Sequence, residues 1–448
     1  MRFFTSFAPH FGLNDTLLSF RERNDQRISE KKKLFMKKLK ILVTVLIIAN
    51  LLACKEDKKE VRSETKIETK QELISRVFAF SEKQYDSLIH RIEHNKPLLQ
   101  PRGVTEEGDL RLKPFQDWTS GFFSGSLWYI YKNNASEKWK NNAMKFTEAL
   151  DSVKYITNSH DLGFMLNCSY GNGYLSTQDS IYKSVIIKGA TSLITRYRPI
   201  IGSIQSWDTT PDMGWISKRG WDTPVIVDNM MNLDLLYRAF EFTKDSTFYN
   251  IATNHAKTTL QHHFRDDYSS FHVVDYDAKT GKVRSRQTAQ GYIDSSSWAR
   301  GQAWGLYGFT QTYKNTKNIA FLNLAKGIAN YIMTNTKIPE DHIPYWDYDA
   351  PKIPNEPRDA SAAAITASAL LTLQEFVPEK KEAMLAYAES ILRRLASQDY
   401  LANYGQNQGF ILMHSVGNIH TGEENDKPLN YADYYFLEAL IKWKELTH

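Results

Sequence analysis

Two aspartates stand where irregular sequence gives way to helical periodicity, and together they could carry acid–base chemistry. Asp161 lies in HDLGF, and Asp228 lies in TPVIVDNMMNLDLLYRA, residues 223–239. Each alone has an ordinary interpretation, because Asp is common at helix N-caps and in Asx turns. If the two share a pocket, both cannot ionise easily, so one stays protonated near neutral pH and becomes a usable general acid.

The segment TAQGYIDSSSWARGQAWGLYGFTQTY carries the densest set of side chains able to bind a sugar, namely Gln290, Trp298, Arg300 and Trp304. A tryptophan face suits the C–H patches of a sugar ring, and a guanidinium can hold a carboxylate through two hydrogen bonds. The segment therefore favours a sugar acid as the ligand. The alternative is a tryptophan-rich core helix in which Arg300 binds a neighbouring aspartate. Trp118, in QDWTSGFFSGSLWYIY, either presents a face to a ligand or packs between helices.

Other chemistries lack their signatures. No HExxH motif occurs, His262 and His263 are adjacent, and His272 stands alone, so no catalytic metal is expected. No G-x-S-x-G motif, P-loop or dinucleotide fingerprint is present, so an esterase, a phosphotransferase or a dehydrogenase is not indicated, and no cofactor is expected. The only cysteines are Cys54 and Cys168, and we expect Cys168 to be a buried thiol.

The elements that must position these residues are mostly helices. From about residue 74 onward, apolar residues recur at three- and four-residue intervals, as in FLNLAKGIANYIMTNT and KEAMLAYAESILRRLA. Helices and loops alternate roughly every 50 to 60 residues, which indicates about six or seven helical pairs. An open solenoid would show a repeated sequence signature, and none is seen. A closed double ring of helices is therefore favoured, with loops rich in aromatic, carboxylate and amide residues converging on one pocket.

The N-terminal segment reads as targeting sequence. Residues 1–70 hold 16 Lys/Arg against 9 Asp/Glu, a net +7, which leaves −2 for the rest of a chain whose total is +5. A body so near neutrality indicates no nucleic-acid partner. From Met36 the chain reads MKKLKILVTVLIIANLLAC, which resembles a bacterial lipoprotein signal whose lipobox ends at Cys54. The resemblance implies cleavage before Cys54, a lipid on its thiol and a place in the cell envelope, either facing the periplasm or on the outer-membrane surface.

The domain organisation follows from this signal. Residues 1–53 are expected to be leader and lipoprotein signal, with residues 1–35 lying before the start codon that the cell uses. Residues 54–73 are highly charged and almost free of aromatic side chains, which predicts a disordered tether. Residues 74–448 are expected to form one catalytic domain, attached to the membrane through the lipid only. The oligomeric state has no signal in the sequence.

Six segments in register resemble the unsaturated glucuronyl hydrolases, glycoside hydrolase family 88, to which the unsaturated rhamnogalacturonyl hydrolases are related. They are DWTSGFFSGSLW, HDLGF, DNMMN, SSWARGQAWGLYG, RDASAAAITASALL and YADYYFLEAL, between Phe115 and Lys442. The resemblance implies an all-α fold, an (α/α)6 barrel, with the active site in its loop-lined mouth. It also implies hydrolysis that releases a 4,5-unsaturated uronic acid from the non-reducing end of lyase-generated oligosaccharides.

The resemblance implies a role for particular residues. The C4=C5 enol ether is hydrated, with Asp228 as general acid and base and Asp161 as its required partner, while His160 and Asn229 beside them orient the acids. For this, the pKa of Asp228 must be lifted towards neutrality against the pull of a helix N-terminus, and the neighbouring Asp161 supplies the opposing push. The family's substrate-lining residues fall on Trp118, His272, Gln290, Trp298, Arg300 and Trp304.

Other assignments remain open at this point. Many family members carry His before the Gln of the QGY element, where this chain has Ala289, which puts the usual substrate preference in doubt. An unsaturated rhamnogalacturonyl hydrolase would share the barrel and the chemistry with a different aglycone. A non-catalytic glycan-binding lipoprotein would capture oligosaccharides through Trp118, Trp298 and Trp304 without turning them over.

Overall fold

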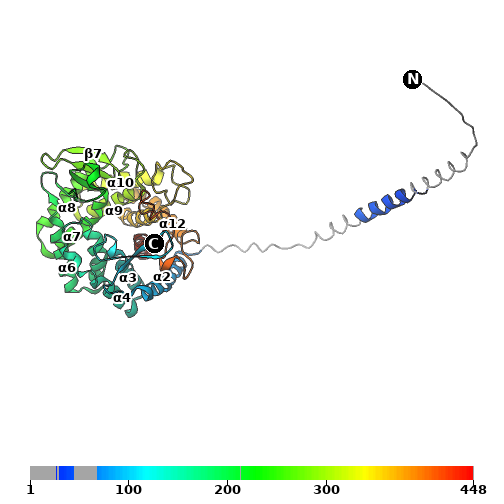
Figure 1. Cartoon of the computed structure of the whole chain (residues 1–448), viewed down its shortest axis with the longest axis horizontal. Coiled ribbons are helices and arrows are strands. Elements are labelled where there is room, and N and C mark those ends of the chain that lie inside the picture. The colour runs from blue at the N-terminus through cyan, green and yellow to red at the C-terminus, as the bar shows by residue number, and fades with distance from the viewer. Residues whose placement is uncertain (1–26, 28–29, 45–67, 212, 447–448) are drawn as a thin grey trace, which may run out of the picture. The chain divides into compact units, whose positions relative to one another are not determined.

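The computed structural model describes residue 27 and residues 30–44, 68–211 and 213–446 (Figure 1). The chain divides into two compact units, residues 1–67 and 68–448. In the first unit, residues 30–44 are helical and exposed. No helix within the described ranges is both long and apolar enough to span a bilayer. The lipobox at Cys54 and the tether up to residue 67 lie outside the described residues.

The second unit is built mainly from helices joined by loops with short strands. Its elements in order are α2 (Lys70–Ile92), β1 (Gln100–Val104), β2 (Leu110–Lys113), α3 (Ser120–Asn134), α4 (Glu137–Glu148), η1 (Asp151–Tyr155), η2 (Gly163–Gly171), α5 (Asn172–Thr177), α6 (Ser180–Ile194), β3 (Tyr197–Arg198), β4 (Ser203–Ile204), η3 (Ser217–Arg219), β5 (Thr223–Ile226), η4 (Val227–Asn232), α7 (Leu233–Thr243), α8 (Ser246–His262), β6 (Val273–Tyr276), β7 (Val283–Gln287), α9 (Ala299–Thr316), α10 (Ile319–Thr334), α11 (Ala360–Leu373), η5 (Gln374–Phe376), η6 (Pro378–Lys380), α12 (Lys381–Leu395), η7 (Asn407–Gly409) and α13 (Asn430–Glu445).

The helices form two concentric rings. The inner ring runs through α3, η2 with α5, α7, α9, α11 and α13, and α13 packs back on α3, which closes it. Helices α4, α6, α8, α10 and α12 each follow and cover an inner neighbour, and α2 covers α13. Burial separates the two rings: every residue of α11 is buried, whereas α4 buries only one stripe, as expected of a helix with one face in water. The predicted (α/α)6 barrel is confirmed.

The start of the barrel differs from the prediction. The tether was expected to reach residue 73, but α2 begins at Lys70 and buries Leu73 and Ile74. Thr69 caps this helix through a capping box, in which Thr69 Oγ1 accepts from the Glu72 backbone N–H at 3.2 Å and Glu72 accepts from the Thr69 N–H at 2.8 Å. The charged composition concealed the helix start because capping boxes are themselves made of polar residues.

A small antiparallel sheet lies beside the start of α7. Strand β6 pairs with β5 and with β7, and Val273 lies opposite Ile226. The pairing continues into the next residues, where the Val227 N–H donates to the His272 carbonyl at 3.0 Å. The sheet therefore sets His272 next to the turn η4, which carries Asp228.

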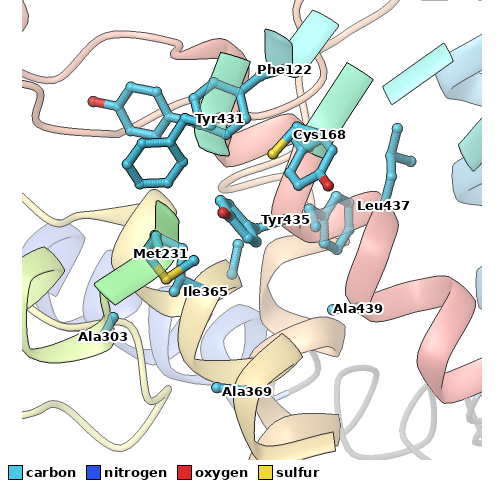
Figure 2. Close-up of a cluster of buried hydrophobic side chains, with 14 of the residues drawn as sticks. Phe122, Cys168, Met231, Ala303, Ile365, Ala369, Tyr431, Tyr435, Leu437 and Ala439 are labelled. Atoms are coloured by element: carbon cyan, nitrogen blue, oxygen red, sulfur yellow. The ribbon is translucent and has the colours of Figure 1, made fainter. Parts of the chain in front are cut away.

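Aromatic side chains fill the centre of the barrel. Figure 2 shows Phe122, Cys168, Tyr431 and Tyr435 converging there, although they come from three separate parts of the sequence. The ring centroids of Trp304 and Tyr435 lie 5.3 Å apart. Cys168 is buried and free, which confirms the expectation of a buried thiol. These rings form a dense floor beneath one mouth of the barrel.

Gly163 holds the turn of Asp161 against the turn of Asp228. A Cβ at Gly163 would lie 2.4 Å from the Cα of Asn232, the last residue of η4. The next residue, Phe164, donates its backbone N–H to Asn232 Oδ1 at 2.9 Å. The two turns can approach this closely only because residue 163 has no side chain.

We expect Gly163→Ala to destabilise the protein by about 1–3 kcal/mol, the usual cost of overpacking, and to lower activity by parting the two turns. Gly171→Ala in the same helix is the matched control, because its Cβ would meet only the side-chain amide of Asn167. Thermal unfolding midpoints and initial rates of both variants check this. A Gly163→Ala protein that unfolds and turns over like wild type would contradict the packing described.

Candidate active site

A pocket of about 190 Å³ opens at one mouth of the barrel, and both Asp161 and Asp228 line it. The other lining residues are Arg102, Trp118, His160, Phe164, Trp207, Ile226, Gln290, Arg300, Gly417, Asn418, Glu424 and Tyr431. Several stand at the first turns of inner helices: Trp118 before α3, Arg300 in α9 and Tyr431 in α13. A larger cavity of about 720 Å³ is lined by residues further along the same helices. The inner helices thus direct their N-termini, which favour anions, at the smaller pocket.

Asp228 is buried, and one of its carboxyl oxygens, Oδ2, accepts no hydrogen bond from the described residues. It lies in the turn η4 before α7 and makes no capping hydrogen bond, so the interpretation as an N-cap is wrong. Its residue is 8 % exposed, and Oδ2 has no hydrogen-bond partner among the described residues. Burial raises the pKa of Asp228 to about 7; Arg300 opposes this shift, and the charge of Asp161 adds to it.

The pKa of Asp161 is also raised. Burial raises its pKa to about 7, against the lowering effect of hydrogen bonding to Asn232 and Ser159. Asp161 and Asp228 line the same pocket, and the charge of Asp161 raises the pKa of Asp228. The prediction of a shared pocket is therefore confirmed. Burial is nevertheless the larger cause of the raised pKa of Asp228, and the push from Asp161 is the smaller one.

His272 faces Asp228 as a neutral donor. Its Nδ1 accepts hydrogen bonds from the backbone N–H groups of Ala289 at 3.1 Å and Gln290 at 3.2 Å. Burial lowers the pKa of His272 to about 3, so the ring is uncharged and its proton is on Nε2. That nitrogen lies 3.5 Å from Asp228 Oδ2. His272 therefore presents an N–H to Asp228 without adding a positive charge that would pull its pKa down.

Arg300 is both a core residue and part of the pocket wall. Its guanidinium binds Asp359 at 3.1 Å, the Gly417 carbonyl at 2.5 Å and the Val416 carbonyl, and lies 4.5 Å from the ring centre of Trp298. The alternative that Arg300 is bound to a neighbouring aspartate is thus observed. Even so, Arg300 lines the pocket and lowers the pKa of Asp228.

The six residues expected to line the substrate divide into two groups. Trp118, Gln290 and Arg300 lie in the pocket wall. The other three, His272, Trp298 and Trp304, are at most 3 % exposed and lie behind the wall. The rings of His272 and Trp298 are 4.5 Å apart, and the Trp304 indole N–H lowers the pKa of Asp228. These three support the wall and the acid instead of offering a free face to a sugar.

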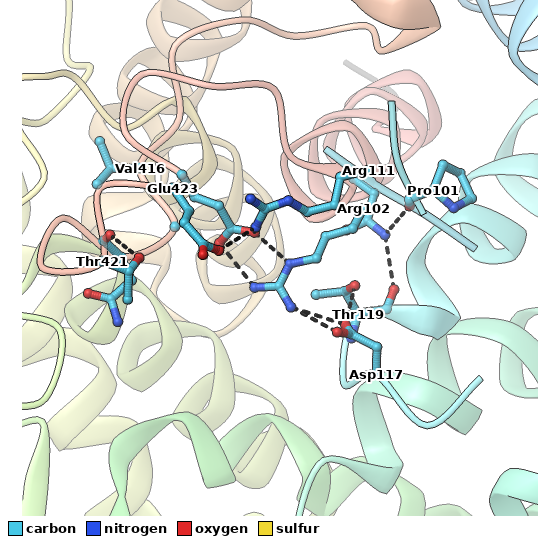
Figure 3. Close-up of polar contacts among 12 residues, drawn as sticks. Pro101, Arg102, Arg111, Asp117, Thr119, Val416, Thr421 and Glu423 are labelled. Atoms are coloured by element: carbon cyan, nitrogen blue, oxygen red, sulfur yellow. Dashed lines mark hydrogen bonds and ion pairs between the residues drawn. The ribbon is translucent and has the colours of Figure 1, made fainter. Parts of the chain in front are cut away.

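The sequence did not indicate several residues of the rim. Arg102, on β1, binds Asp117 at 2.9 Å and Glu424 at 2.5 Å, and Arg111 binds Glu423 at 3.0 Å (Figure 3). The ion pairs with Glu423 and Glu424 tie the β1–β2 hairpin to the loop before α13, and the pair with Asp117 ties it to the segment before α3. Trp207 was also missed, although its loop, SWDTTPDMGW, is conspicuously rich in tryptophan.

One group among the described residues could hold a metal ion, and it lies outside the pocket. His90, Glu93 and His94 bring ligand atoms within 4.8 Å of one another at the end of α2, where they are largely exposed. None of them lines the pocket. Exposed groups of this kind are common on protein surfaces, so this one carries no assignment.

Comparisons with known proteins agree with this geometry. A scan against protein-family models gives no match. An unsaturated glucuronyl hydrolase of Formosa agariphila is 40 % identical over 417 residues, covering 92 % of this chain and 99 % of that protein. An unsaturated chondroitin disaccharide hydrolase of Streptococcus pneumoniae is 32 % identical, covering 80 % of this chain and 90 % of that one. A crystal structure of an unsaturated glucuronyl hydrolase specific for heparin superposes with a TM-score of 0.79 at 45 % identity, covering 84 % and 98 %.

A closed double ring of helices with two acids in one mouth is the arrangement expected of an (α/α)6-barrel glycoside hydrolase, and the relatives and the solved structure are all named as hydrolases. Identity of 40 % across nearly the whole of both chains goes further than the fold. The chain belongs to the unsaturated glucuronyl hydrolase family. The resemblance seen in the sequence, and with it the expectation of a hydrolase, is confirmed.

The charge of Asp161 raises the pKa of Asp228, so Asp161→Asn should lower that pKa. An acid that must be protonated loses activity above its pKa. We therefore expect the alkaline limb of the residual activity to move to lower pH, by about one unit, a typical environmental shift.

The pH dependence of kcat measures this shift, with Asp266→Asn as an exposed control outside the pocket. An unmoved alkaline limb, or one that moves to higher pH, would show that Asp161 does not set the protonation of Asp228.

Proposed function

We propose that this chain removes the 4,5-unsaturated uronic acid from the non-reducing end of lyase-generated oligosaccharides, by hydration of the C4=C5 enol ether. The observation that carries the proposal is an acid pair in one pocket, the buried Asp228 and the partly buried Asp161, each with its pKa raised to about 7. Membership of the family supports the same reaction. A carboxyl group that is protonated near neutral pH can donate the proton that the reaction needs.

The pocket suits an acidic sugar. Inner-helix N-termini point at it, and Arg102 and Arg300 line it, and both features favour the substrate's carboxylate. Trp118 is half-buried and offers an aromatic surface to the sugar ring. Gln290 donates its amide N–H to the Gly417 carbonyl at 2.9 Å, which fixes the side chain and leaves its oxygen for a hydroxyl group.

In the proposed mechanism, Asp228 transfers its proton to C4 and becomes a carboxylate. The double-bond electrons form the new C4–H bond, and the positive charge that remains at C5 is shared with the ring oxygen. Asp228 then accepts a proton from a water molecule while the water oxygen bonds to C5. The resulting hemiketal opens and releases the aglycone, and Asp228 is protonated again. His272 stays neutral throughout, with Nε2 at 3.5 Å from Asp228 Oδ2.

Asp161 has a different role in this proposal. Its own pKa is raised to about 7, so the pair shares protons as a unit near neutral pH. With Asp161 ionised, its charge holds the proton on Asp228 and then favours the positive charge that develops at C5. His160 lies next to it, and the side chain of Asn229 hydrogen-bonds the Ile204 carbonyl at 2.9 Å, which fixes the turn of Asp228.

Two alternatives receive less support. A related unsaturated rhamnogalacturonyl hydrolase would use the same acids, but the relatives found are glucuronyl and chondroitin disaccharide hydrolases. A glycan-binding lipoprotein was expected to capture oligosaccharides through Trp118, Trp298 and Trp304, and two of these, Trp298 and Trp304, are covered. Such a binder also has no use for two acids with raised pKa values in one pocket.

We also propose that the protein is a lipoprotein anchored through Cys54 in the cell envelope, facing the periplasm or on the outer-membrane surface, with its barrel attached by a tether that ends before α2. The lipobox LLAC supports this. Mass spectrometry of the mature N-terminus tests it. An acylated Cys54 as the first residue is expected, and a mature chain that still carries residues 1–35 would refute both the anchor and the later start codon.

Loss of ultraviolet absorbance follows the loss of the conjugated double bond and so reports the reaction directly. We expect wild type to consume unsaturated disaccharides, and Asp228→Asn to be at least about a hundredfold slower, because general acid catalysis contributes roughly 10² to 10⁴. Asp234→Asn is the matched control, since Asp234 lies six positions further on but lines the opposite cavity. No absorbance loss with any unsaturated uronate, or a folded Asp228→Asn enzyme within threefold of wild type, would refute the assignment.

A further inference from the structure

Three tryptophans, Trp207, Trp215 and Trp221, form a connected aromatic surface that leads out of the pocket. We call it the tryptophan ledge. The ring of Trp207 stacks on that of Trp221 at 5.6 Å and 23°, and the edge of Trp215 meets Trp207 at 5.4 Å and 72°. Trp207 lines the pocket itself. The ledge is therefore continuous with the site of the proposed reaction.

The ledge is anchored at its base and open at its outer end. Trp221 is 6 % exposed, and its indole N–H donates to Gln287 on β7 at 2.9 Å. Trp215 is 51 % exposed, although two tryptophan rings contact it. A large aromatic side chain that packs on its neighbours and is left half in water is typical of a surface that binds a ligand.

A cation accompanies the ledge. The Arg219 guanidinium lies 5.9 Å from the ring centre of Trp215 and 5.4 Å from that of Trp221. Within the described part of the chain it forms no ion pair with a carboxylate, and it is exposed. It is near enough to the pocket to lower the pKa of His272. Its positive charge is thus free to meet an anionic group on a ligand that lies on the ledge.

We infer that the tryptophan ledge binds the aglycone, the sugars that follow the unsaturated uronate, and that Arg219 selects aglycones carrying a sulfate or a carboxylate. The inference rests on the proposed function. The pocket of about 190 Å³ is smaller than sites that enclose drug-sized ligands, so the aglycone must continue outside it. Its C–H face suits the exposed ring of Trp215, and its acidic group suits Arg219.

Three substrates distinguish whether Arg219 binds a sulfate or a carboxylate of the aglycone. The probes are an unsulfated unsaturated disaccharide, the same disaccharide with one O-sulfate on its hexosamine, and an unsulfated unsaturated tetrasaccharide whose third residue is a uronate. A sulfate effect appears only with the second probe, and a carboxylate effect only with the third.

For Trp215→Ala, kcat/KM on the tetrasaccharide should fall about three- to tenfold, the range expected for a lost aromatic contact. Turnover of the unsulfated disaccharide should fall by a smaller factor, since that substrate reaches least far along the ledge. Trp215→Tyr, which keeps an aromatic face, should restore most of the loss. An equal loss on all three probes, or no loss on any, would overturn the inference.

For Arg219→Gln, kcat/KM should fall about two- to fivefold on whichever charged probe is bound, the size of an exposed ion pair. Lys218→Gln is the matched control, because it removes the same charge from the neighbouring exposed residue, which makes no contact with the ledge rings among the described residues. Equal effects of the two substitutions, or no effect of Arg219→Gln, would overturn the role of Arg219.

Binding separates this inference from the proposed function. The tetrasaccharide should bind the Asp228→Asn protein more weakly when Trp215→Ala is added, as measured by calorimetry. If wild type turned over no probe while this difference in binding persisted, the reaction would be wrong and the ledge right. If turnover were normal and the added substitution left binding unchanged, the ledge would be wrong and the reaction right.

Discussion

The structure depends on one electrostatic constraint, the burial of the Asp228 carboxyl group in a place where its charge is poorly solvated. A carboxylate removed from water without compensating partners is costly, so the protonated form is favoured. The pocket supplies little compensation: Oδ2 lacks a normal hydrogen bond within the described residues, and a second acid faces it. The same constraint makes Asp228 an acid at neutral pH and makes the site sensitive to small changes in its surroundings.

The barrel balances opposing influences on this one group. Inner-helix N-termini and Arg300 favour the carboxylate, both of the protein and of a bound uronate, whereas burial and Asp161 favour the proton. Arg300 is held by Asp359 and two backbone carbonyls, so its charge stays at a fixed distance. The neutral tautomer of His272 is set by two backbone N–H groups, so Nε2 lies 3.5 Å from Asp228 Oδ2 without adding a positive charge to this balance. Because backbone groups hold both Arg300 and His272, the fold itself sets the protonation of Asp228.

Much of the fold and part of the site could be predicted from the sequence. Periodicity predicted the helical ring because burying one face of each helix imposes the 3.6-residue spacing, and the motif resemblance placed Asp161 and Asp228 in one site. How deeply each of these side chains is buried was harder to predict. Trp304 has the chemistry of a sugar platform, but it lies five residues into α9, about 7.5 Å along the helix axis, where the barrel floor covers it. Arg102 and Trp207 come from irregular segments, and only tertiary packing brings them to the rim.

The central claim is that Asp228 holds a proton near neutral pH. Carbon-13 NMR of protein labelled at the aspartate side-chain carboxyl carbons tests it most directly, with the Asp228 signal assigned by its loss in Asp228→Asn. The account predicts a titration midpoint near the pKa of about 7. A midpoint near 4, the ordinary value for aspartate, would contradict it, since the group would then be ionised when the reaction needs its proton.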